Sequence, residues 1–132
     1  MKNKPRKLKK LYRLFARYYL IKLVYLFGSQ SQDNCGPLSD YDFAIYIDSN
    51  SISAMQNIKM ELMTVLSQLL KTDNIDIVII NTVDGSDLKF NIISEGMLIY
   101  EREPYKIIIE PRIMNEYYDY HAMMLRYGLT KG

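Results

Sequence analysis

Asp40 and Asp42 are the residues whose type and spacing best suit a chemical role. Residues two apart in a strand project from one face, so two carboxylates placed this way stand roughly 6–7 Å apart and repel each other. A bound cation relieves the repulsion, and Mg²⁺ binds through one or two carboxylates together with substrate phosphates. The pair predicts a metal platform at the start of a strand. A turn in which Asp40 caps local amides is the alternative.

Two further features could complete such a site. Gly28-Ser29 follows a short apolar run, where glycine permits close backbone approach and a hydroxyl with neighbouring amides can hold phosphate oxygens. An ordinary turn at the end of a strand would look the same. Asp76 interrupts an apolar stretch, where a charge is costly unless it is paired, metal-bound or turned to solvent at a sheet edge.

Hydrophobic periodicity predicts the elements that must position these residues. We expect one α/β domain. Helices are expected over 8–22, 53–71 and 86–94, strands over 23–27, 42–47, 75–80 and 97–100, and a loop over 29–39. Ser53 and Gln56 have capping-box spacing, and Gly96 suits a helix C-terminus. Pro111 is expected in the first turn of a last helix, which Gly128 closes.

Composition excludes several classes of protein. With 48% apolar and 24% charged residues, the 132-residue chain is typical of a soluble domain. No apolar run approaches the roughly 20 residues that span a bilayer, and the N-terminus does not resemble a secretory signal. A single cysteine, Cys35, fits the reducing cytoplasm. A single histidine, His121, excludes zinc sites with two histidines, and we expect it to be a packed or surface residue.

Residues 1–10 form a basic N-terminal tail ahead of a single domain over 11–132. The tail carries no acid, whereas the remaining chain is net acidic; its basic residues are Lys2, Lys4, Arg6, Lys7, Lys9 and Lys10. A frayed, solvated terminus is the favoured interpretation, and contact with nucleic acid or an acidic partner is the alternative.

Taken together, Gly28-Ser29, Asp40-Tyr41-Asp42 and the later Asp76 resemble the nucleotidyltransferase superfamily that includes DNA polymerase beta. More closely, the chain resembles the minimal nucleotidyltransferases paired with HEPN-domain toxins in prokaryotic toxin–antitoxin modules. The similar segments are 26–29, 39–45, 74–78 and 92–100. The resemblance implies a small mixed β-sheet with helices packed against it.

The resemblance also implies the reaction. A hydroxyl, expected to be a tyrosine of the partner HEPN toxin, would attack the α-phosphate of ATP and release pyrophosphate, and the AMP added would neutralise the toxin. Asp40, Asp42 and Asp76 would bind two Mg²⁺ ions and form the catalytic set, while Gly28 and Ser29 would hold the nucleotide. Asp76 could also accept the proton of the attacking hydroxyl.

Two alternatives remain open. Family members carry a basic residue soon after the glycine–serine pair, but residues 30–36 contain no Arg or Lys, and such a loop offers less to a triphosphate. An antitoxin that only sequesters its toxin is therefore one alternative. The other is a small-molecule nucleotidyltransferase, which would usually need a second, helical domain.

The C-terminal segment is rich in large apolar side chains. Tyrosines and methionines are enriched at protein interfaces, and they could equally pack on the core. A homo- or hetero-oligomer formed through this segment is therefore one expectation, and packing of the segment on the core is the other. The residues concerned include Tyr117, Tyr118, Tyr120, Met123, Met124 and Tyr127. Met114, Tyr118, His121 and Leu125 share one helical face.

Overall fold

The computed structural model describes residues 4–27 and 41–128 of the chain. The described helices and strands follow one another in the order that the hydrophobic periodicity predicts. In chain order the elements are α1 (Lys4–Ala16), β1 (Ile21–Phe27), β2 (Tyr41–Ile47), α3 (Ile52–Leu70), β3 (Ile75–Ile79), the short 3₁₀ helix η1 (Ile80–Thr82), α4 (Ser86–Glu95), β4 (Met97–Glu101) and α5 (Tyr105–Arg126).

The four strands form one mixed sheet in the order β3-β2-β1-β4. β1 is antiparallel to both β2 and β4, and β2 and β3 are parallel. β1 and β2 therefore occupy the centre, and their side chains are almost all buried because helices cover both faces. The predicted fold class, a small mixed sheet with helices packed against it, is confirmed.

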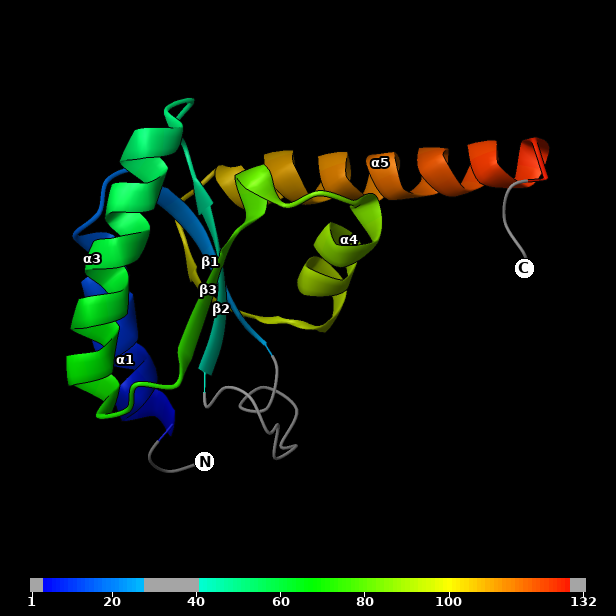
Figure 1. The fold of residues 1–132 in the computed structure, drawn as a ribbon. Helices are drawn as coiled ribbons and strands as arrows, with labels where there is room; N and C mark the ends of the chain where they lie inside the picture. The colour runs from blue at the N-terminus through cyan, green and yellow to red at the C-terminus, as the bar shows by residue number, and fades with distance from the viewer. Residues whose placement is uncertain (1–3, 28–40, 129–132) are drawn as a thin grey trace.

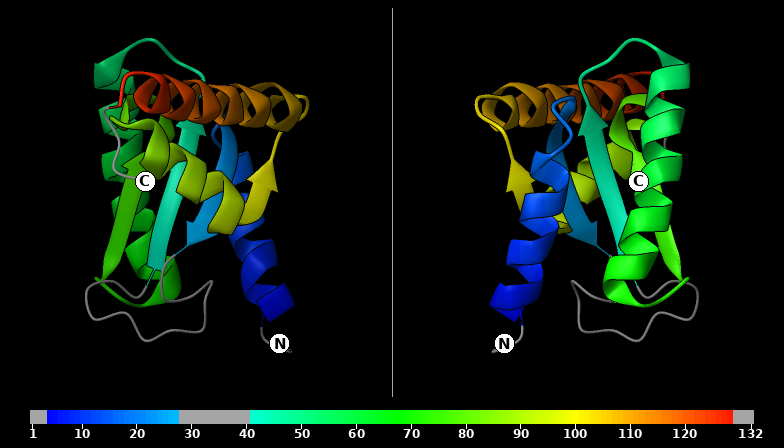
Figure 2. Two further views of the ribbon diagram at one scale, coloured as in Figure 1. Left: turned by 90° about the vertical axis from the view of Figure 1, so that its right-hand side faces the viewer. Right: turned by 90° about the vertical axis from the view of Figure 1, so that its left-hand side faces the viewer.

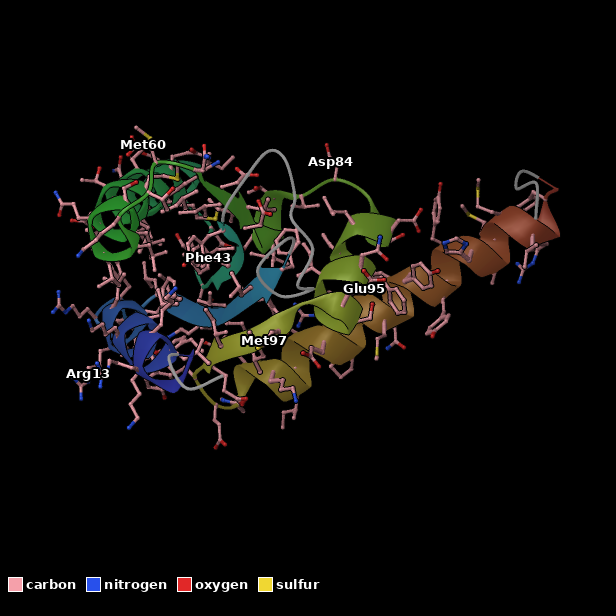
Figure 3. The ribbon with its side chains drawn as sticks, turned by 90° about the horizontal axis from the view of Figure 1, so that it is seen from below. Arg13, Phe43, Met60, Asp84, Glu95 and Met97 are labelled. Atoms are coloured by element: carbon pink, nitrogen blue, oxygen red, sulfur yellow. The ribbon has the colours of Figure 1, made fainter. Side chains whose placement is uncertain are left out.

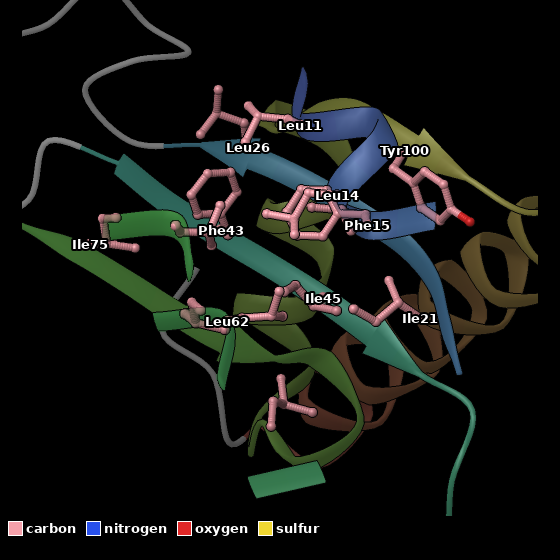
Figure 4. Close-up of a cluster of buried hydrophobic side chains, with 14 of the residues drawn as sticks. Leu11, Leu14, Phe15, Ile21, Leu26, Phe43, Ile45, Leu62, Ile75 and Tyr100 are labelled. Atoms are coloured by element: carbon pink, nitrogen blue, oxygen red, sulfur yellow. The ribbon is translucent and has the colours of Figure 1, made fainter. Parts of the chain in front are cut away.

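Helices cover both faces of the sheet (Figure 1). Side chains alternate between the two faces and build two separate cores. On one face, α1 and α3 pack over a large cluster that includes Phe15, Phe43 and Leu62 (Figure 4). On the other face, α4 and the first part of α5 pack over a smaller cluster around Tyr25 and Ile92 (Figure 2).

Helix α1 differs at both ends from the prediction. It begins at Lys4 and ends at Ala16, whereas the sequence pattern predicts residues 8–22. Beyond its end, Tyr18 N–H donates to Phe15 O at 3.1 Å and Ile21 N–H to Tyr18 O at 3.0 Å. Tyr18 and Leu20 pack on the same core as the helix, so the apolar pattern continues through a turn. The tail expected to be frayed is helical from Lys4, and the division at residue 10 stays a prediction.

The N-cap of α3 is Ser51, not the predicted Ser53. The Ser51 hydroxyl accepts from the Ala54 backbone N–H at 3.1 Å, and Ser51 N–H donates to Ser49 Oγ at 3.0 Å. Serines stand at positions 49, 51 and 53 around the start of this helix, and their spacing alone does not reveal which one adopts the extended backbone of a cap.

Helix α5 passes through Pro111, which was wrongly expected in a first turn. Proline there removes one backbone hydrogen bond. Pro111 is exposed, and the buried Ile109 and Ile113 on either side of it hold the helix against the second core. None of the helices in the described residues combines the length and apolar character that crossing a membrane requires.

Candidate active site

Asp42 and Asp76 lie directly opposite each other on neighbouring parallel strands. Asp42 is the second residue of β2, Asp76 is the second residue of β3, and the two are partners in the strand register. Neighbouring strands are spaced by about 4.8 Å, so the two Cα atoms are close. Sequence reasoning predicted that these two acids belong to one site, and the sheet brings them together.

Both carboxylates belong to the face of the sheet that α4 and α5 cover. Ala44 and Val78, two residues further along β2 and β3, pack in the second core, and alternation places Asp42 and Asp76 on their side. Asp42 is half-buried and Asp76 is exposed. The pair therefore sits where the packed face opens to solvent.

The register also connects the acids to β1. Phe27, the residue before Gly28, is the partner of Asp42. Because β1 and β2 are antiparallel, β1 ends where β2 begins. The backbone N–H of Tyr41 donates to Asn74 O at 3.2 Å and so holds the start of β2 against the segment before β3. Three segments distant in sequence meet at this end of the sheet, which faces the viewer in Figure 3.

Three predicted site residues, Gly28, Ser29 and Asp40, lie outside the described residues, as does the predicted loop over 29–39. Their roles stay predictions. Among the residues that the structure describes, no three His, Cys, Asp or Glu side chains gather in a possible metal site.

The two described acids suit a hard divalent cation. Like charges directly opposite on adjacent strands destabilise the sheet, and a cation between them reverses the sign of that interaction. Carboxylate oxygens are the donors that Mg²⁺ prefers, and the exposure of Asp76 leaves room for water and phosphate oxygens. The residues present therefore fit the predicted magnesium site.

His121 does not belong to this site. It lies on α5, and its Nε2 is 2.8 Å from Asp87 Oδ1 on α4. Its ring also contacts Tyr117, with centroids 4.4 Å apart. This is the surface role expected for a lone histidine.

A cavity of about 380 Å³ lies at the other end of the sheet, between the end of β2, η1 and α5. Its lining includes Tyr46, Lys89 and Arg112. Beside it, the Asn81 side chain bridges both backbone groups of Ile47, accepting at 3.0 Å and donating at 2.6 Å. No sequence motif predicted this cavity. Within the described part of the chain, its lining contains a single acid, Glu116, so this cavity lacks the paired carboxylates of the predicted site.

The family model for polymerase beta nucleotidyltransferases matches residues 9–105. The chain belongs to this nucleotidyltransferase family. The matched region runs from within α1 through β4 and contains Asp42 and Asp76, whereas nearly all of α5 lies beyond it. No curated protein sequence matches significantly.

Solved structures confirm the nucleotidyltransferase fold. A chain from a mutant of the MntA–HepT toxin–antitoxin complex is 19% identical, with a TM-score of 0.71 over 91% of this chain and 94% of that one. A toxin–antitoxin structure with AMP-PNP is 21% identical, with a TM-score of 0.68 over 92% and 93%. A structure of a tri-AMPylated Shewanella oneidensis HEPN toxin with its MNT antitoxin is 18% identical, with a TM-score of 0.68 over 93% of each chain.

Proposed function

We propose that this chain is the antitoxin nucleotidyltransferase of a two-protein toxin–antitoxin module. It transfers AMP from ATP to a tyrosine hydroxyl of a HEPN toxin in the cytoplasm and so neutralises the toxin. The observation that carries the proposal is the in-register pair Asp42 and Asp76 in a chain of the nucleotidyltransferase family. The similar chains come from complexes described as toxin–antitoxin pairs, one of them with a tri-AMPylated toxin.

We assign a task to each residue from the family resemblance, which the register of Asp42 and Asp76 supports. Asp40, Asp42 and Asp76 would hold Mg²⁺, which neutralises charge on the phosphates and on the entering and leaving oxygens when it is bound. The tyrosine oxygen forms a bond to the α-phosphorus as the bond to the pyrophosphate oxygen breaks. Asp76, exposed at the sheet edge, can accept the hydroxyl proton. Gly28 and Ser29 are proposed to hold the terminal phosphates.

The test is transfer of label from ATP carrying ³²P at the α-position to the toxin encoded beside this chain. Wild type with Mg²⁺ should label the toxin. Asp42→Asn should lower the rate by at least about a hundredfold, because the site then loses one anionic ligand beside the developing charge. Asp84→Asn is the matched control, since Asp84 is exposed in the segment before α4 (Figure 3), and it should label at the wild-type rate.

Toxin RNase activity must be followed in the same samples. Labelling with EDTA present, or equal labelling by Asp42→Asn, would contradict the metal site. Neutralisation of the RNase by wild type and Asp42→Asn alike, without label on the toxin, would replace the proposal with sequestration. The cation-free loop over 30–36 is the observation that favours this second function.

A further inference from the structure

Helices α1 and α3 both lie on one face of the sheet (Figure 2), and residues of the two helices together line a groove. The groove consists of two adjoining hollows of about 290 and 230 Å³. Both are lined by Lys10 of α1 and Leu69 of α3, so they form one continuous surface. We call it the α1–α3 groove. It lies on the opposite face of the sheet from Asp42 and Asp76.

The rim of the α1–α3 groove is strongly basic. Its cations are Arg6, Lys7, Lys10, Arg13, Arg17 and Lys71. Among the described residues, no acidic side chain lines either hollow, and none of these cations forms an ion pair. All six side chains are exposed, and Arg13 points away from the sheet in Figure 3. Six positive charges that form no ion pair with a described residue, on α1, just beyond its end and at the end of α3, attract an anionic partner.

The floor of the groove is aliphatic. It is made by Leu14, Val65, Leu69 and Leu70, which are buried or half-buried. No aromatic side chain lines either hollow within the described part of the chain. Proteins that bind single-stranded nucleic acid stack the bases on aromatic rings, and this groove offers them none. A leucine-lined floor between basic rims instead matches an amphipathic protein segment with an acidic outer face.

The basic end of the groove reaches the start of β2. Lys7 Nζ donates to the Tyr41 hydroxyl at 2.7 Å and lies 5.3 Å from the centre of its ring. Tyr41 immediately precedes Asp42 in β2. A protein held in the groove is thereby anchored at the same end of the sheet as the reacting carboxylates.

We propose that the α1–α3 groove is the docking site for an acidic, amphipathic segment of the protein that accepts the nucleotide. Aliphatic side chains of that segment cover Leu14, Val65 and Leu69, and its carboxylates pair with the cations of α1. The inference rests on the proposed function for the identity of the acceptor. The groove itself is defined by its own charges and floor.

The probe is a fluorescein-labelled amphipathic helical peptide of glutamate and leucine, with its binding measured by anisotropy. Lys10→Glu/Arg13→Glu should raise the Kd by at least about tenfold, because two attractions become repulsions. Lys106→Glu/Arg112→Glu on α5 changes the net charge equally and should leave the Kd within about twofold, because long-range effects are screened. Circular dichroism must show that both double variants fold.

Two further probes make the test specific. A peptide of the same composition, scrambled so that it has no apolar face, should bind at least about tenfold more weakly than the amphipathic one. Single-stranded RNA that binds more tightly than the peptide, and loses affinity in the Lys10→Glu/Arg13→Glu variant, would overturn the proposal in favour of nucleic acid. Equal weakening by both double variants would overturn it in favour of net charge alone.

A transfer assay separates this inference from the proposed function. Lys10→Glu/Arg13→Glu should slow AMP transfer at low toxin concentration and recover the wild-type rate at saturating toxin, because docking changes KM and leaves the chemistry intact. Asp42→Asn should bind the peptide with wild-type Kd while losing transfer. If wild type transfers no AMP, the proposed function fails, and the peptide-binding experiment still shows whether the α1–α3 groove is a docking site. A lower rate for the groove variant at saturating toxin would contradict a docking role.

Discussion

Tyr25 is the residue that ties the centre of the sheet to α5. Its side chain is 1% exposed, and its hydroxyl donates to Glu110 Oε2 at 2.5 Å. Burial raises the pKa of Tyr25 well above its ordinary value of 10.0, and the hydrogen bond to Glu110 raises it further. The phenol therefore remains a hydrogen-bond donor at any physiological pH, and it fixes the base of α5 on the sheet.

Replacing Tyr25 with phenylalanine tests this link. Tyr25→Phe should lower the free energy of unfolding by about 1–3 kcal/mol, because it leaves the partly buried Glu110 carboxylate without its donor. Urea unfolding followed by circular dichroism measures the change. Tyr12→Phe, at a 48% exposed ring, is the matched control and should stay within about 0.5 kcal/mol. Equal losses would show that the hydroxyl of Tyr25 contributes nothing specific.

Wild type and Tyr25→Phe should also differ in how their stability depends on pH. A pKa raised in the folded state contributes stability that is fully present below the unfolded pKa of about 10 and is lost as pH rises above it. The stability of wild type should thus fall above pH 10, and Tyr25→Phe should lose less over the same interval. Parallel curves for wild type and Tyr25→Phe would assign the alkaline loss to other tyrosines, such as Tyr18, whose pKa is also raised by burial.

At the scale of single elements, the serines before α3 give a matched comparison. Ser51→Ala should lower the free energy of unfolding by about 1 kcal/mol, because the Ala54 N–H loses its acceptor. Ser53 is the second residue of α3 and its side chain is exposed, so Ser53→Ala should change the free energy of unfolding by less than about 0.5 kcal/mol. Thermal or urea unfolding measures both. The opposite order would restore Ser53 as the cap.

Pro111 offers a test in the stabilising direction. Pro111→Ala should raise the free energy of unfolding by about 1–2 kcal/mol, because the regained helical hydrogen bond outweighs the extra freedom of the unfolded chain. Because position 111 is exposed, the alanine side chain should cause no steric clash. The shift of the urea midpoint measures the gain. A loss of stability would mean that the course of α5 depends on the proline ring.

Local sequence predicts the four strands and helices α3 and α4 to within two residues at each end, whereas it predicts the ends of α1 poorly. The strand ending at Phe27 and the helix before Gly96 follow from turn residues and apolar runs. The family resemblance placed Asp42 and Asp76 in one site, and their register as direct partners is a finding of the structure. The end of α1 does not follow from the apolar pattern, because the turn after Ala16 packs on the same core as the helix. Helix α5 continues through Pro111 because tertiary packing of Ile109 and Ile113 overrides local propensity.

The Lys7–Tyr41 contact and the α1–α3 groove were also invisible in the sequence. They join residues more than thirty positions apart, and no local pattern reports the distance between two helices. The basic residues of the tail were visible in the sequence. Their composition is the same whether the tail is frayed or forms a helical rim, so it could not distinguish the two. Asp42 and Asp76 were predictable because an acid within an apolar strand stands out in the local sequence, and recognising it needs no knowledge of distant residues.

At the scale of the whole molecule, α5 is half packed and half free. Its first part covers the second core, while its far end extends beyond the sheet (Figure 1). The shared face of Met114, Tyr118 and Leu125 is 41%, 58% and 64% exposed. Tyr117 and Tyr118 of the same segment contact Phe90 of α4, with ring centroids 3.9 and 5.9 Å apart, so the tyrosine-rich segment is packed in part and exposed in part.

Substitutions along α5 should reproduce this division. Ile113→Ala should lower the free energy of unfolding by about 2–4 kcal/mol, because it opens a cavity in the second core. Leu125→Ala should change it by less than about 0.5 kcal/mol, because that side chain is mostly in water already. Urea unfolding of the two variants gives the comparison. A large loss from Leu125→Ala would show that the far end of α5 is covered in solution.

The strand order has a consequence for synthesis of the chain. β1 is a central strand, but its β4 partner lies more than seventy residues later. A ribosome that adds about 5–20 residues per second leaves that edge of β1 unpaired for roughly 4–15 seconds. During this interval a strongly apolar strand presents open backbone groups, the arrangement that favours pairing with another nascent chain. We therefore expect the yield of folded protein to respond to ribosome-associated chaperones and to translation speed across residues 48–96.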